Sequence, residues 1–397
     1  MTQERSFDIV LFGATGFTGG LVAQHLAATA RKQPLRWAVA GRSRDKLTAV
    51  VRGLGAGAEQ VGVLMADSAD AASLAALAQQ AKVVITTVGP YALYGEPLVK
   101  ACAEAGTHYV DLTGEPAFVE RVIDRYHGLA AKRGAKIVNA CGFDSIPHDF
   151  GAYFTVKALA ERLGEAAMAT ATVHMEGFVR AGGSFSGGTW HSAVTAMGNA
   201  RADARERRNR VRAPRPEGGR RVHGVSPSLR FRKELGVWAL PMPTIDPQVV
   251  LRSARALPAY GAEFAYGHYV GLKHAYQALG LTAGVGAVFV LAQLPMTRAR
   301  LLALRAPGEG PDAATRAKGW FCVTFQGHAA GQSITTEVRG GDPGYGDTAK
   351  MLAESALCLA FDTASLPSTS GVLTSVEAMG DALFPRLEAN GIHFRVR

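Results

Sequence analysis

The chain has 397 residues, 48% of them hydrophobic, so it is long enough for two domains with apolar cores and too apolar for a disordered protein. Its formal net charge is +10, and residues 201–233 contribute +9 of it, from twelve basic and three acidic residues. No aromatic residue precedes Phe231 in this basic segment, so platforms for stacking bases are missing and nucleic acid is disfavoured as a partner. The segment is either a solvated loop or a contact for an acidic carrier protein, a phosphorylated substrate carrier or anionic lipid.

Cysteine spacing and the N-terminus both indicate the cytoplasm. The four cysteines lie far apart, with no CxxC pair and no histidine cluster at metal spacing. We therefore expect reduced, mostly buried thiols and no metal site. The polar start at residues 1–6 leads directly into a predicted strand and leaves no room for a signal peptide.

The first predicted strand, residues 7–12, passes through a glycine-rich turn into a helix predicted over residues 17–30. Gly13 permits a tight turn, Gly16 lets a ligand approach the backbone, and Gly19 allows the helix to pack on the strand. Unpaired N–H groups and the helix dipole then favour a pyrophosphate, so the turn indicates dinucleotide binding rather than a purely structural loop. The residues of this turn that we expect at the cofactor are Gly13, Thr15, Gly16, Phe17, Thr18 and Gly19.

Strands and helices alternate over residues 1–150, as is typical of an α/β domain with a doubly wound parallel sheet of the Rossmann type. Further strands are predicted at residues 35–40, 61–66, 82–88, 108–112 and 136–140, with helices from residue 45, after residue 67, and at residues 95–105 and 116–133. Small or polar residues follow each strand. Because open sheets of this kind bind ligands at the carboxyl ends of their strands, we place the site there.

The residues after the second strand, Gly41-Arg-Ser-Arg44, indicate NADP rather than NAD. An enzyme that uses NAD normally places an acidic residue at this point, to accept hydrogen bonds from the ribose hydroxyls. Arg42 instead offers a planar fork for a 2′-phosphate, and Ser43 adds a hydroxyl donor. Asp67, after the third strand, either accepts a hydrogen bond from the adenine amino group or caps a helix.

Residues after the fourth and later strands are the candidates for catalysis. Gly89 and Pro90 end the fourth strand, where the backbone passes close to the nicotinamide. Hydride transfer to a polarised double bond needs a nearby proton donor, and our candidates are Tyr91, Asp144 and His148. Tyr91 is either that donor or a packed ring, and His148 is either that donor or a cap of the following helix. The other polar residues at these strand ends are Asp111, Thr113, Glu115 and Ser145.

A change of pattern after residue 150 predicts a second domain over residues 151–345. Apolar and polar residues alternate there with period two, which favours an antiparallel sheet with one covered face in an α+β substrate and dimerisation domain. The predicted strands of this domain are residues 168–177, 320–325 and 333–338. Residues 346–397 form a C-terminal segment, with a helix predicted at 348–361, that we expect to pack back on the first domain.

The segment 278–294 is uncharged and is followed by Arg298, Arg300 and Arg305. It lies at the short end of the roughly 17–25 residues that cross a bilayer. It is therefore a buried helix or dimer interface, a membrane-surface anchor or acyl-chain site, or a spanning helix.

Several motifs in chain order resemble a known family. They are Gly-Ala-Thr-Gly-Phe-Thr-Gly (13–19), Ala-Gly-Arg-Ser (40–43), Val-Gly-Pro-Tyr (88–91), Tyr-Val-Asp-Leu-Thr-Gly-Glu (109–115), Cys-Gly-Phe-Asp-Ser-Ile-Pro (141–147), Ser-Gly-Gly-Thr (186–189), Asp-Pro-Gly-Tyr-Gly-Asp-Thr (342–348) and Gly-Val-Leu-Thr (371–374). Together they resemble the saccharopine dehydrogenase-like oxidoreductases, and most of all the trans-acting enoyl reductases. The sequence has neither the Gly-x-Ser-x-Gly of α/β-hydrolases nor the Tyr-x-x-x-Lys pair of short-chain dehydrogenases.

The resemblance implies an NADPH-dependent reductase that acts in lipid biosynthesis on the double bond of a fatty-acyl or polyketide thioester. It further implies an acidic acyl-carrier protein or a polyketide synthase as the partner that holds the substrate. Two alternatives remain open, a saccharopine-type amino-acid or imine dehydrogenase and a non-catalytic NADP-binding protein at membranes. We expect a cytoplasmic protein, either free or peripheral at a membrane surface, and either monomeric or a homodimer.

Overall fold

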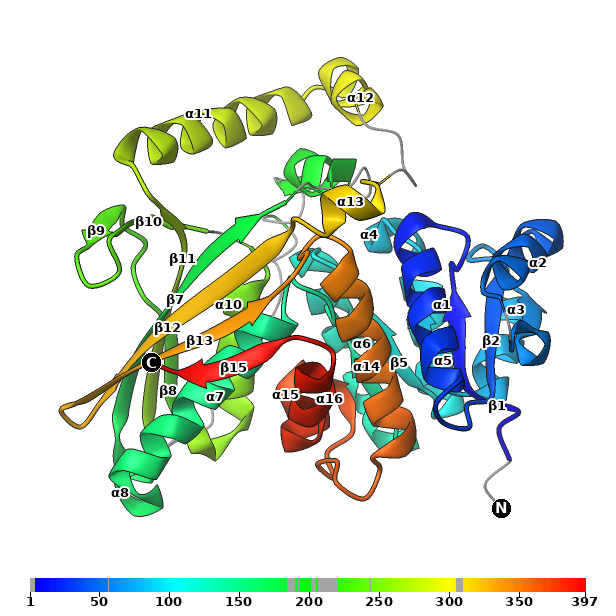
Figure 1. Ribbon diagram of the computed structural model, residues 1–397, viewed down its shortest axis with the longest axis horizontal. Coiled ribbons are helices and arrows are strands. Elements are labelled where there is room, and N and C mark those ends of the chain that lie inside the picture. Colours follow the sequence, from blue (N-terminus) through cyan, green and yellow to red (C-terminus); the bar gives the residue numbers. More distant parts are fainter. Residues whose placement is uncertain are drawn as a thin grey trace. The chain divides into compact units, whose positions relative to one another are not determined.

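The chain folds into two compact units, each of which gathers segments that are distant in the sequence (Figure 1). The computed structural model describes residues 4–55, 57–183, 190–191, 193–200, 205, 220–242, 244–304 and 310–397. Unit 1 comprises Met1–Ile146, Asp312–Gly319 and Gly340–His393. Unit 2 comprises Pro147–Pro311, Trp320–Arg339 and Phe394–Arg397.

Unit 1 is built on a sheet that, in the described part of the chain, has seven strands in the order β14-β6-β5-β4-β1-β2-β3. Its strands are β1 (Phe7–Phe12), β2 (Trp37–Gly41), β3 (Gly62–Met65), β4 (Ala81–Thr86), β5 (His108–Asp111), β6 (Lys136–Val138) and β14 (Gly371–Leu373). All neighbouring pairs are parallel, which confirms the predicted doubly wound sheet. The order along the chain reverses between β1 and β4, and this is where such sheets bind their ligands.

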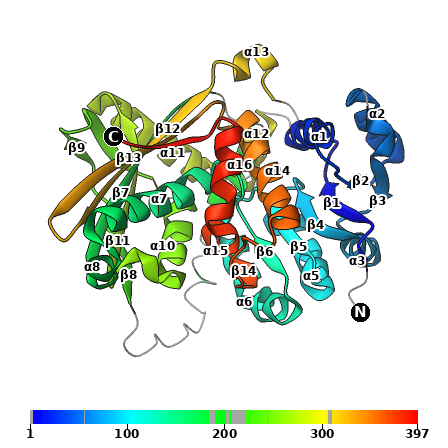
Figure 2. The ribbon, with the colours of Figure 1, turned by 60° about the horizontal axis from the view of Figure 1, so that its bottom comes forward.

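Helices cover both faces of this sheet (Figure 2). Helices α1 (Phe17–Ala30) and α14 (Gly346–Phe361) lie on one face, and α3 (Ala71–Gln80), α5 (Glu96–Ala105) and α6 (Pro116–Arg133) lie on the other. Burial on both faces explains why β1 and β4 are continuous apolar runs without alternation. The remaining helices of unit 1 are α2 (Arg44–Gly53), η1 (Ala58–Gln60), α4 (Tyr91–Tyr94), α13 (Ala313–Arg316), α15 (Ser375–Met379), η3 (Gly380–Ala382) and α16 (Leu383–Ala389).

Unit 2 contains a sheet in which, among the residues that can be described, β15-β13-β12-β7-β11-β10-β9 follow one another and β8 pairs with β11. Its strands are β7 (Thr172–Gly182), β8 (Arg221–Gly224), β9 (Arg230–Arg232), β10 (Val237–Pro241), β11 (Glu263–Leu272), β12 (Trp320–Ala329), β13 (Gln332–Gly340) and β15 (His393–Val396). The predicted antiparallel sheet is wrong in part, because β11 is parallel to both β7 and β8. The pairs β12–β7, β10–β11 and β10–β9 are antiparallel, so the sheet is mixed.

Two further predictions for unit 2 need correction. Residues 165–170 form the helix α8 (Glu165–Thr170), so the strand predicted from residue 168 begins only at Thr172. The run Glu-Ala-Ala-Met-Ala favours a helix by intrinsic propensity, and this local preference prevails over the alternating pattern. In the basic segment 201–233, residues 220–233 contribute β8 and β9 rather than a loop, and residues 201–204 and 206–219 lie outside the described residues.

The uncharged segment 278–294 belongs to the helix α11 (Ala275–Ala292), which precedes α12 (Pro295–Ala303). Only Ala278 and Ala292 of α11 are buried, so the expectation of a buried core helix is wrong. Figure 1 shows α11 standing apart from the sheet of its own unit. The expectation of buried cysteines is confirmed for all four.

Helices α7 (Ile146–Leu163) and α10 (Asp246–Ala256) pack on the sheet of unit 2. The closest approach of α7 is at Gly151, where an added Cβ would lie 2.3 Å from Cε2 of Phe325 and 2.8 Å from Cγ2 of Val338. The hydroxyls of Thr155 and Thr336 share a hydrogen bond of 2.6 Å one turn further along. Gly151 therefore sets the distance between α7 and the sheet.

Replacing Gly151 with Ala should destabilise the protein by about 1–3 kcal/mol, because the new methyl group overlaps the Phe325 ring. Gly128 in α6 is the matched control, since it is also inside a helix but has nothing within 4 Å of an added Cβ. Gly128→Ala should stabilise the protein by about 0.5–1 kcal/mol through helix propensity. Denaturant unfolding of both variants tests this, and a gain of stability in both would contradict the close approach of α7.

Candidate cofactor site and active site

The turn between β1 and α1 has the geometry of a phosphate-binding loop. Gly13 adopts φ +97°, and a Cβ on Gly19 would lie 2.2 Å from the carbonyl oxygen of Gly13, so both positions require glycine. Gly16 is the N-cap of α1, has no side-chain cap, and has only the Gly13 carbonyl near its Cβ position, at 3.5 Å. The first turn of α1 contains no acidic residue, so its N–H groups and dipole favour an anion.

Phe17, the first residue of α1, carries a contact that sequence reasoning missed. Its ring packs edge-on against Tyr345, with 4.8 Å between ring centroids, and the Arg316 guanidinium lies 5.4 Å from the Phe17 centroid. Arg316 ends α13, in a short segment of unit 1 that follows the glycine loop by almost 300 residues. It adds a positive charge next to the loop, and nothing in its local sequence indicates that position. Thr15 is exposed at the tip of the loop, and Thr18 is partly buried in the first turn of α1.

The end of β2 keeps both predicted contacts for a 2′-phosphate available. Arg42 is exposed and has no ion-pair partner within the described chain. Ser43 is the N-cap of α2, where its Oγ accepts a 3.4 Å hydrogen bond from the Lys46 N–H and retains its own hydrogen to donate. Asp67 does not cap α3, since that role belongs to Asp70. Asp67 instead closes a turn by accepting a 3.0 Å hydrogen bond from the Ala69 N–H.

The residues after β4 turn sharply into α4. The Gly89–Pro90 bond is cis, and Gly89 is exposed. Tyr91 is only 3% exposed, and its hydroxyl donates a 3.1 Å hydrogen bond to the Thr86 carbonyl while accepting one from the Leu112 N–H. Burial raises the pKa of Tyr91 well above its ordinary value of 10. The predicted proton donor Tyr91 is thus placed in the core, with its hydroxyl directed at the backbone.

A buried carboxylate joins the carboxyl ends of β5 and β6. Oδ1 of Asp111 accepts hydrogen bonds from the N–H groups of Thr113, at 3.1 Å, and Ala140, at 2.8 Å. Oδ2 accepts from the Tyr109 hydroxyl at 2.8 Å and from the Asn139 amide at 2.7 Å. Burial nevertheless outweighs these four bonds and raises the pKa of Asp111 to about 6. Asp111 therefore has a structural task, which is to hold the two strand ends together.

The loop after β6 presents Asp144 next to this network. The Cys141 N–H donates a 2.6 Å hydrogen bond to the Asp111 carbonyl, and the Phe143 N–H donates one of 3.0 Å to Oγ1 of Thr348. Asp144 itself is exposed, and no hydrogen bond from the described residues holds its carboxylate. A Cβ on Gly114 would lie 3.1 Å from Oδ2 of Asp144, so the carboxylate lies close over that glycine. The surrounding protein raises the pKa of Asp144 to about 6 by desolvation.

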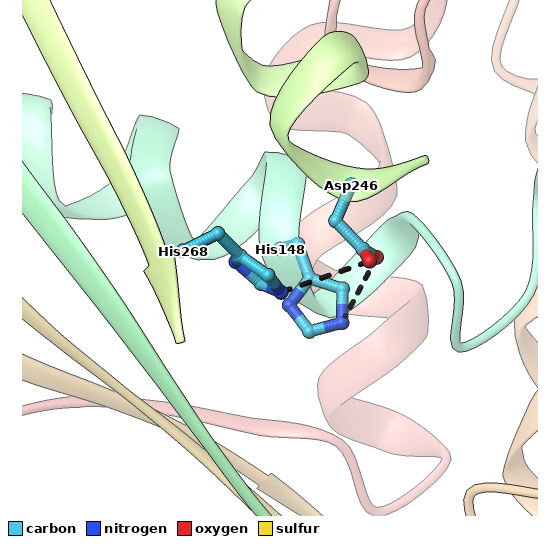
Figure 3. Close-up of side chains that lie close together, drawn as sticks. All are labelled: His148, Asp246 and His268. Atoms are coloured by element: carbon cyan, nitrogen blue, oxygen red, sulfur yellow. Dashed lines mark ion pairs between the residues drawn. The ribbon is translucent and has the colours of Figure 1, made fainter. Parts of the chain in front are cut away.

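His148, the third predicted donor, lies in a buried cluster of unit 2 (Figure 3). Its Nε2 is 3.2 Å from Oδ1 of Asp246, and Nε2 of His268 is 3.7 Å from Oδ2 of the same carboxylate. The hydroxyl of Tyr266 shares a 3.0 Å hydrogen bond with Nδ1 of His268, and burial lowers the pKa of His268 to about 3. These contacts tie the first turns of α7 and α10 to β11.

Two histidines and a carboxylate are also ligands that zinc accepts. The three donor atoms lie within 4.8 Å of one another, whereas ligands about 2.1 Å from a tetrahedral zinc ion are separated by about 3.4 Å. The direct contact between His148 and Asp246 is already at ion-pair distance. The arrangement is therefore described best as a buried polar cluster that packs two helices on the sheet.

Comparison with known proteins shows both the domain type and the relatives of the whole chain. Residues 9–138 match the family model of the saccharopine dehydrogenase NADP binding domain. A Mycobacterium tuberculosis protein named as a candidate trans-acting enoyl reductase is 39% identical over 98% of this chain and 97% of its own length. A trans-acting enoyl reductase of Mycobacterium ulcerans is 37% identical over 98% of each chain.

The fold of the whole chain also has a solved counterpart. Apo saccharopine dehydrogenase (L-Glu forming) from Saccharomyces cerevisiae superposes with a TM-score of 0.52 over 98% of this chain and 100% of that chain. The sequences are 14% identical, so this likeness concerns the fold alone.

Replacing Asp111 with Asn should destabilise the protein by about 2–4 kcal/mol. All four partners of the carboxylate are donors, so the new NH2 group faces a donor in either orientation of the amide. The matched control is Asp70→Asn, which keeps a good N-cap on α3 and should change stability by less than about 0.5 kcal/mol. Equal effects of the two substitutions in denaturant unfolding would contradict the structural role of Asp111.

Proposed function

Because the chain belongs to the trans-acting enoyl reductase family, we propose that it uses NADPH to reduce the carbon–carbon double bond of an enoyl thioester. The chain is an NAD(P)-dependent oxidoreductase, with a match to an NADP binding domain over residues 9–138 and whole-chain relatives of that name. The substrate class is the part that we propose. We infer a fatty-acyl or polyketide chain, reduced in the cytoplasm as a step of lipid synthesis.

One observation carries the proposal, which is the composition of the carboxyl edge of the sheet in unit 1. The glycine loop after β1 suits a pyrophosphate, and an accessible carboxyl group with a raised pKa, Asp144, follows β6 of the same sheet. Reduction of an enoyl thioester requires a hydride at the β-carbon and a proton at the α-carbon. A carboxyl group with a pKa of about 6 is partly protonated near neutral pH and can donate that proton.

NADPH, when bound, supplies the hydride. We propose that the first turn of α1 binds its pyrophosphate and that Arg42 and Ser43 bind its 2′-phosphate. Asp67 would then accept a hydrogen bond from the adenine, and the backbone at Gly89 and Pro90 would line the nicotinamide. The support for this assignment is the uncapped first turn of α1, the unpaired state of Arg42 within the described residues, and the spare donor of Ser43.

Among the three predicted donors we assign proton transfer to Asp144. The Tyr91 hydroxyl donates to a backbone carbonyl in the core, and the His148 ring contacts Asp246 with 1% of the residue exposed. A proton donor must reach the substrate carbon, and an exposed group without a competing partner is better suited to that task. Asp144 meets this condition in the described chain.

We further propose that the acyl chain arrives on a separate carrier or synthase, which is what a reductase that acts in trans requires. Part of the basic segment cannot serve as the contact for such a partner. Arg230 and Arg232 pair with the buried Glu176, and Arg220 donates to the carbonyls of Ala254, Leu257 and Gly261. The alternative of an amino-acid or imine dehydrogenase is supported only by the fold.

Replacing Asp144 with Asn should lower kcat for enoyl thioester reduction by about 100-fold or more while leaving NADPH affinity unchanged. In the unmodified enzyme kcat/KM should fall as pH rises above about 6, because the donor must be protonated, and this decline should be absent in the variant.

The reaction is followed as NADPH oxidation and saturated product, with enoyl-CoA and enoyl-carrier substrates of several chain lengths. Gly114→Ala serves as a graded variant, since its methyl group would lie 3.1 Å from Oδ2 of Asp144 without removing the carboxyl group. Full activity of Asp144→Asn would exclude Asp144 as the donor. Absence of saturated product with every substrate would exclude the reaction itself.

Replacing Arg42 with Ala should weaken NADPH binding by about tenfold or more, equivalent to about 1.4 kcal/mol, and leave NADH binding unchanged. The physical reason is loss of the cation that faces the 2′-phosphate. Arg44→Ala is the matched control, because Arg44 is exposed two residues further on in the first turn of α2. Titration of intrinsic fluorescence with both nucleotides tests this, and equal losses for NADPH and NADH would contradict the assignment.

A further inference from the structure

Helix α11 is the most unusual surface element of unit 2, because it is apolar and almost entirely exposed. It has 18 residues, no charge and a mean hydropathy of 1.6, and only 11% of its residues are buried. Tyr276 is 70% exposed, Leu279 73% and Val290 64%. A helix at a protein surface normally directs a polar face to water, and α11 has no such face.

The exposed apolar side chains surround the helix rather than forming a stripe. They are Tyr276, Leu279, Leu281, Val285, Phe289, Val290 and Leu291. With 3.6 residues per turn, these positions are distributed on all sides of the axis. A second copy of the chain or a carrier protein would cover one side and leave the other apolar sides in water. A lipid phase covers all sides at once, so lipid is the occupant that fits.

The polar groups of α11 are already satisfied in the way that a lipid environment requires. Thr282 donates back to the Ala278 carbonyl at 2.8 Å, and the Gln293 amide donates to the carbonyls of Met197, at 2.7 Å, and Phe289, at 3.3 Å. Away from water, each unpaired polar group costs several kcal/mol, so such internal bonds are a precondition for insertion.

The two ends of the helix are closed by the same principle. At the start, the His274 N–H donates a 3.0 Å hydrogen bond to Oε1 of Gln277 in a capping box. At the end, Nε of Arg298 donates to the Ala292 carbonyl at 2.8 Å, and the Thr297 hydroxyl donates to the Leu291 carbonyl. The carbonyl groups that a helix end leaves open are thus partly capped by side chains.

Charge and connection indicate how the helix would lie. Lys273 precedes α11 and Arg300 follows it, both exposed, so each end carries a cation that suits anionic headgroups. Both ends also return to unit 2. The N-terminal end continues from β11, and at the C-terminal end Nε1 of Trp190 donates a 2.6 Å hydrogen bond to the Leu301 carbonyl in α12. A helix held at both ends by one compact unit lies in the plane of a membrane surface.

We propose that α11 inserts parallel to the surface into the interfacial layer of an anionic lipid bilayer and thereby holds the protein at a membrane. The inference is independent of the reductase reaction, because it concerns the surface of unit 2 and none of the residues assigned to the cofactor or to proton transfer.

The test uses the full-length protein with sedimented vesicles made of equal parts phosphatidylcholine and phosphatidylglycerol. The unmodified protein should sediment with these vesicles and much less with phosphatidylcholine alone. Leu279→Glu combined with Val290→Glu should lower the bound fraction by about tenfold or more, since each substitution places a charge in the layer that α11 would occupy. Both side chains are mostly exposed, so the fold should tolerate the changes.

The matched control is Leu229→Glu combined with Val396→Glu, which places the same charges at other exposed apolar positions of unit 2. This control should sediment with vesicles like the unmodified protein, and thermal unfolding of both double variants confirms that they fold. As a second measurement, a Tyr276→Trp reporter should shift its emission to shorter wavelength when anionic vesicles are added.

Four results would overturn the proposal. They are no binding to anionic vesicles, equal binding to both kinds of vesicle, equal binding of the α11 double variant, and an emission that vesicles do not shift. A stable dimer in solution that only the α11 substitutions dissociate, without vesicle binding, would assign the helix to a second copy of the chain instead.

Discussion

The cost of placing a carboxylate inside the protein organises the candidate site. Asp111 is fully buried, and its two oxygens accept four hydrogen bonds from groups at the ends of β5 and β6. A buried charge persists only where such bonds are present, so the two strand ends cannot separate without leaving the carboxylate unsatisfied. The loop that carries Asp144 is fastened to the same residue through the Cys141 N–H. The position of the proposed proton donor thus depends on a residue that does not meet the substrate.

Much of unit 1 could be predicted from the sequence because its local signals agree with each other. Buried parallel strands are continuous apolar runs, and the predicted helices at 17–30 and 116–133 coincide with α1 and α6. Unit 2 was harder to predict, since β11 pairs in parallel with two strands, and the sequence of β11 shows no pairing direction. Arg316 reaches the glycine loop only through the tertiary fold, so no local pattern could indicate it.

The three predicted proton donors show why residue type and strand-end position were not sufficient to choose among them. Tyr91, Asp144 and His148 all follow strands of the same sheet in sequence, yet their surroundings differ. The Tyr91 hydroxyl is directed into the core, and His148 contacts Asp246, a residue far along the chain in the first turn of α10. Asp144 alone among these three is exposed. Exposure and hydrogen-bond partners are properties of the folded chain, and they separate the candidates where spacing does not.

The discontinuous composition of unit 1 has a consequence for how the chain is made. Thirteen of the sixteen residues of α14 are buried, and together with β14 it comes from Gly340–His393, near the end of the chain. Domains commonly fold during synthesis from the N-terminus onward. Here the ribosome must complete nearly the whole polypeptide before the face of the sheet beneath α14 can be covered. The emerging chain therefore carries an open apolar face through most of translation, which makes it a natural client for a chaperone that binds nascent chains.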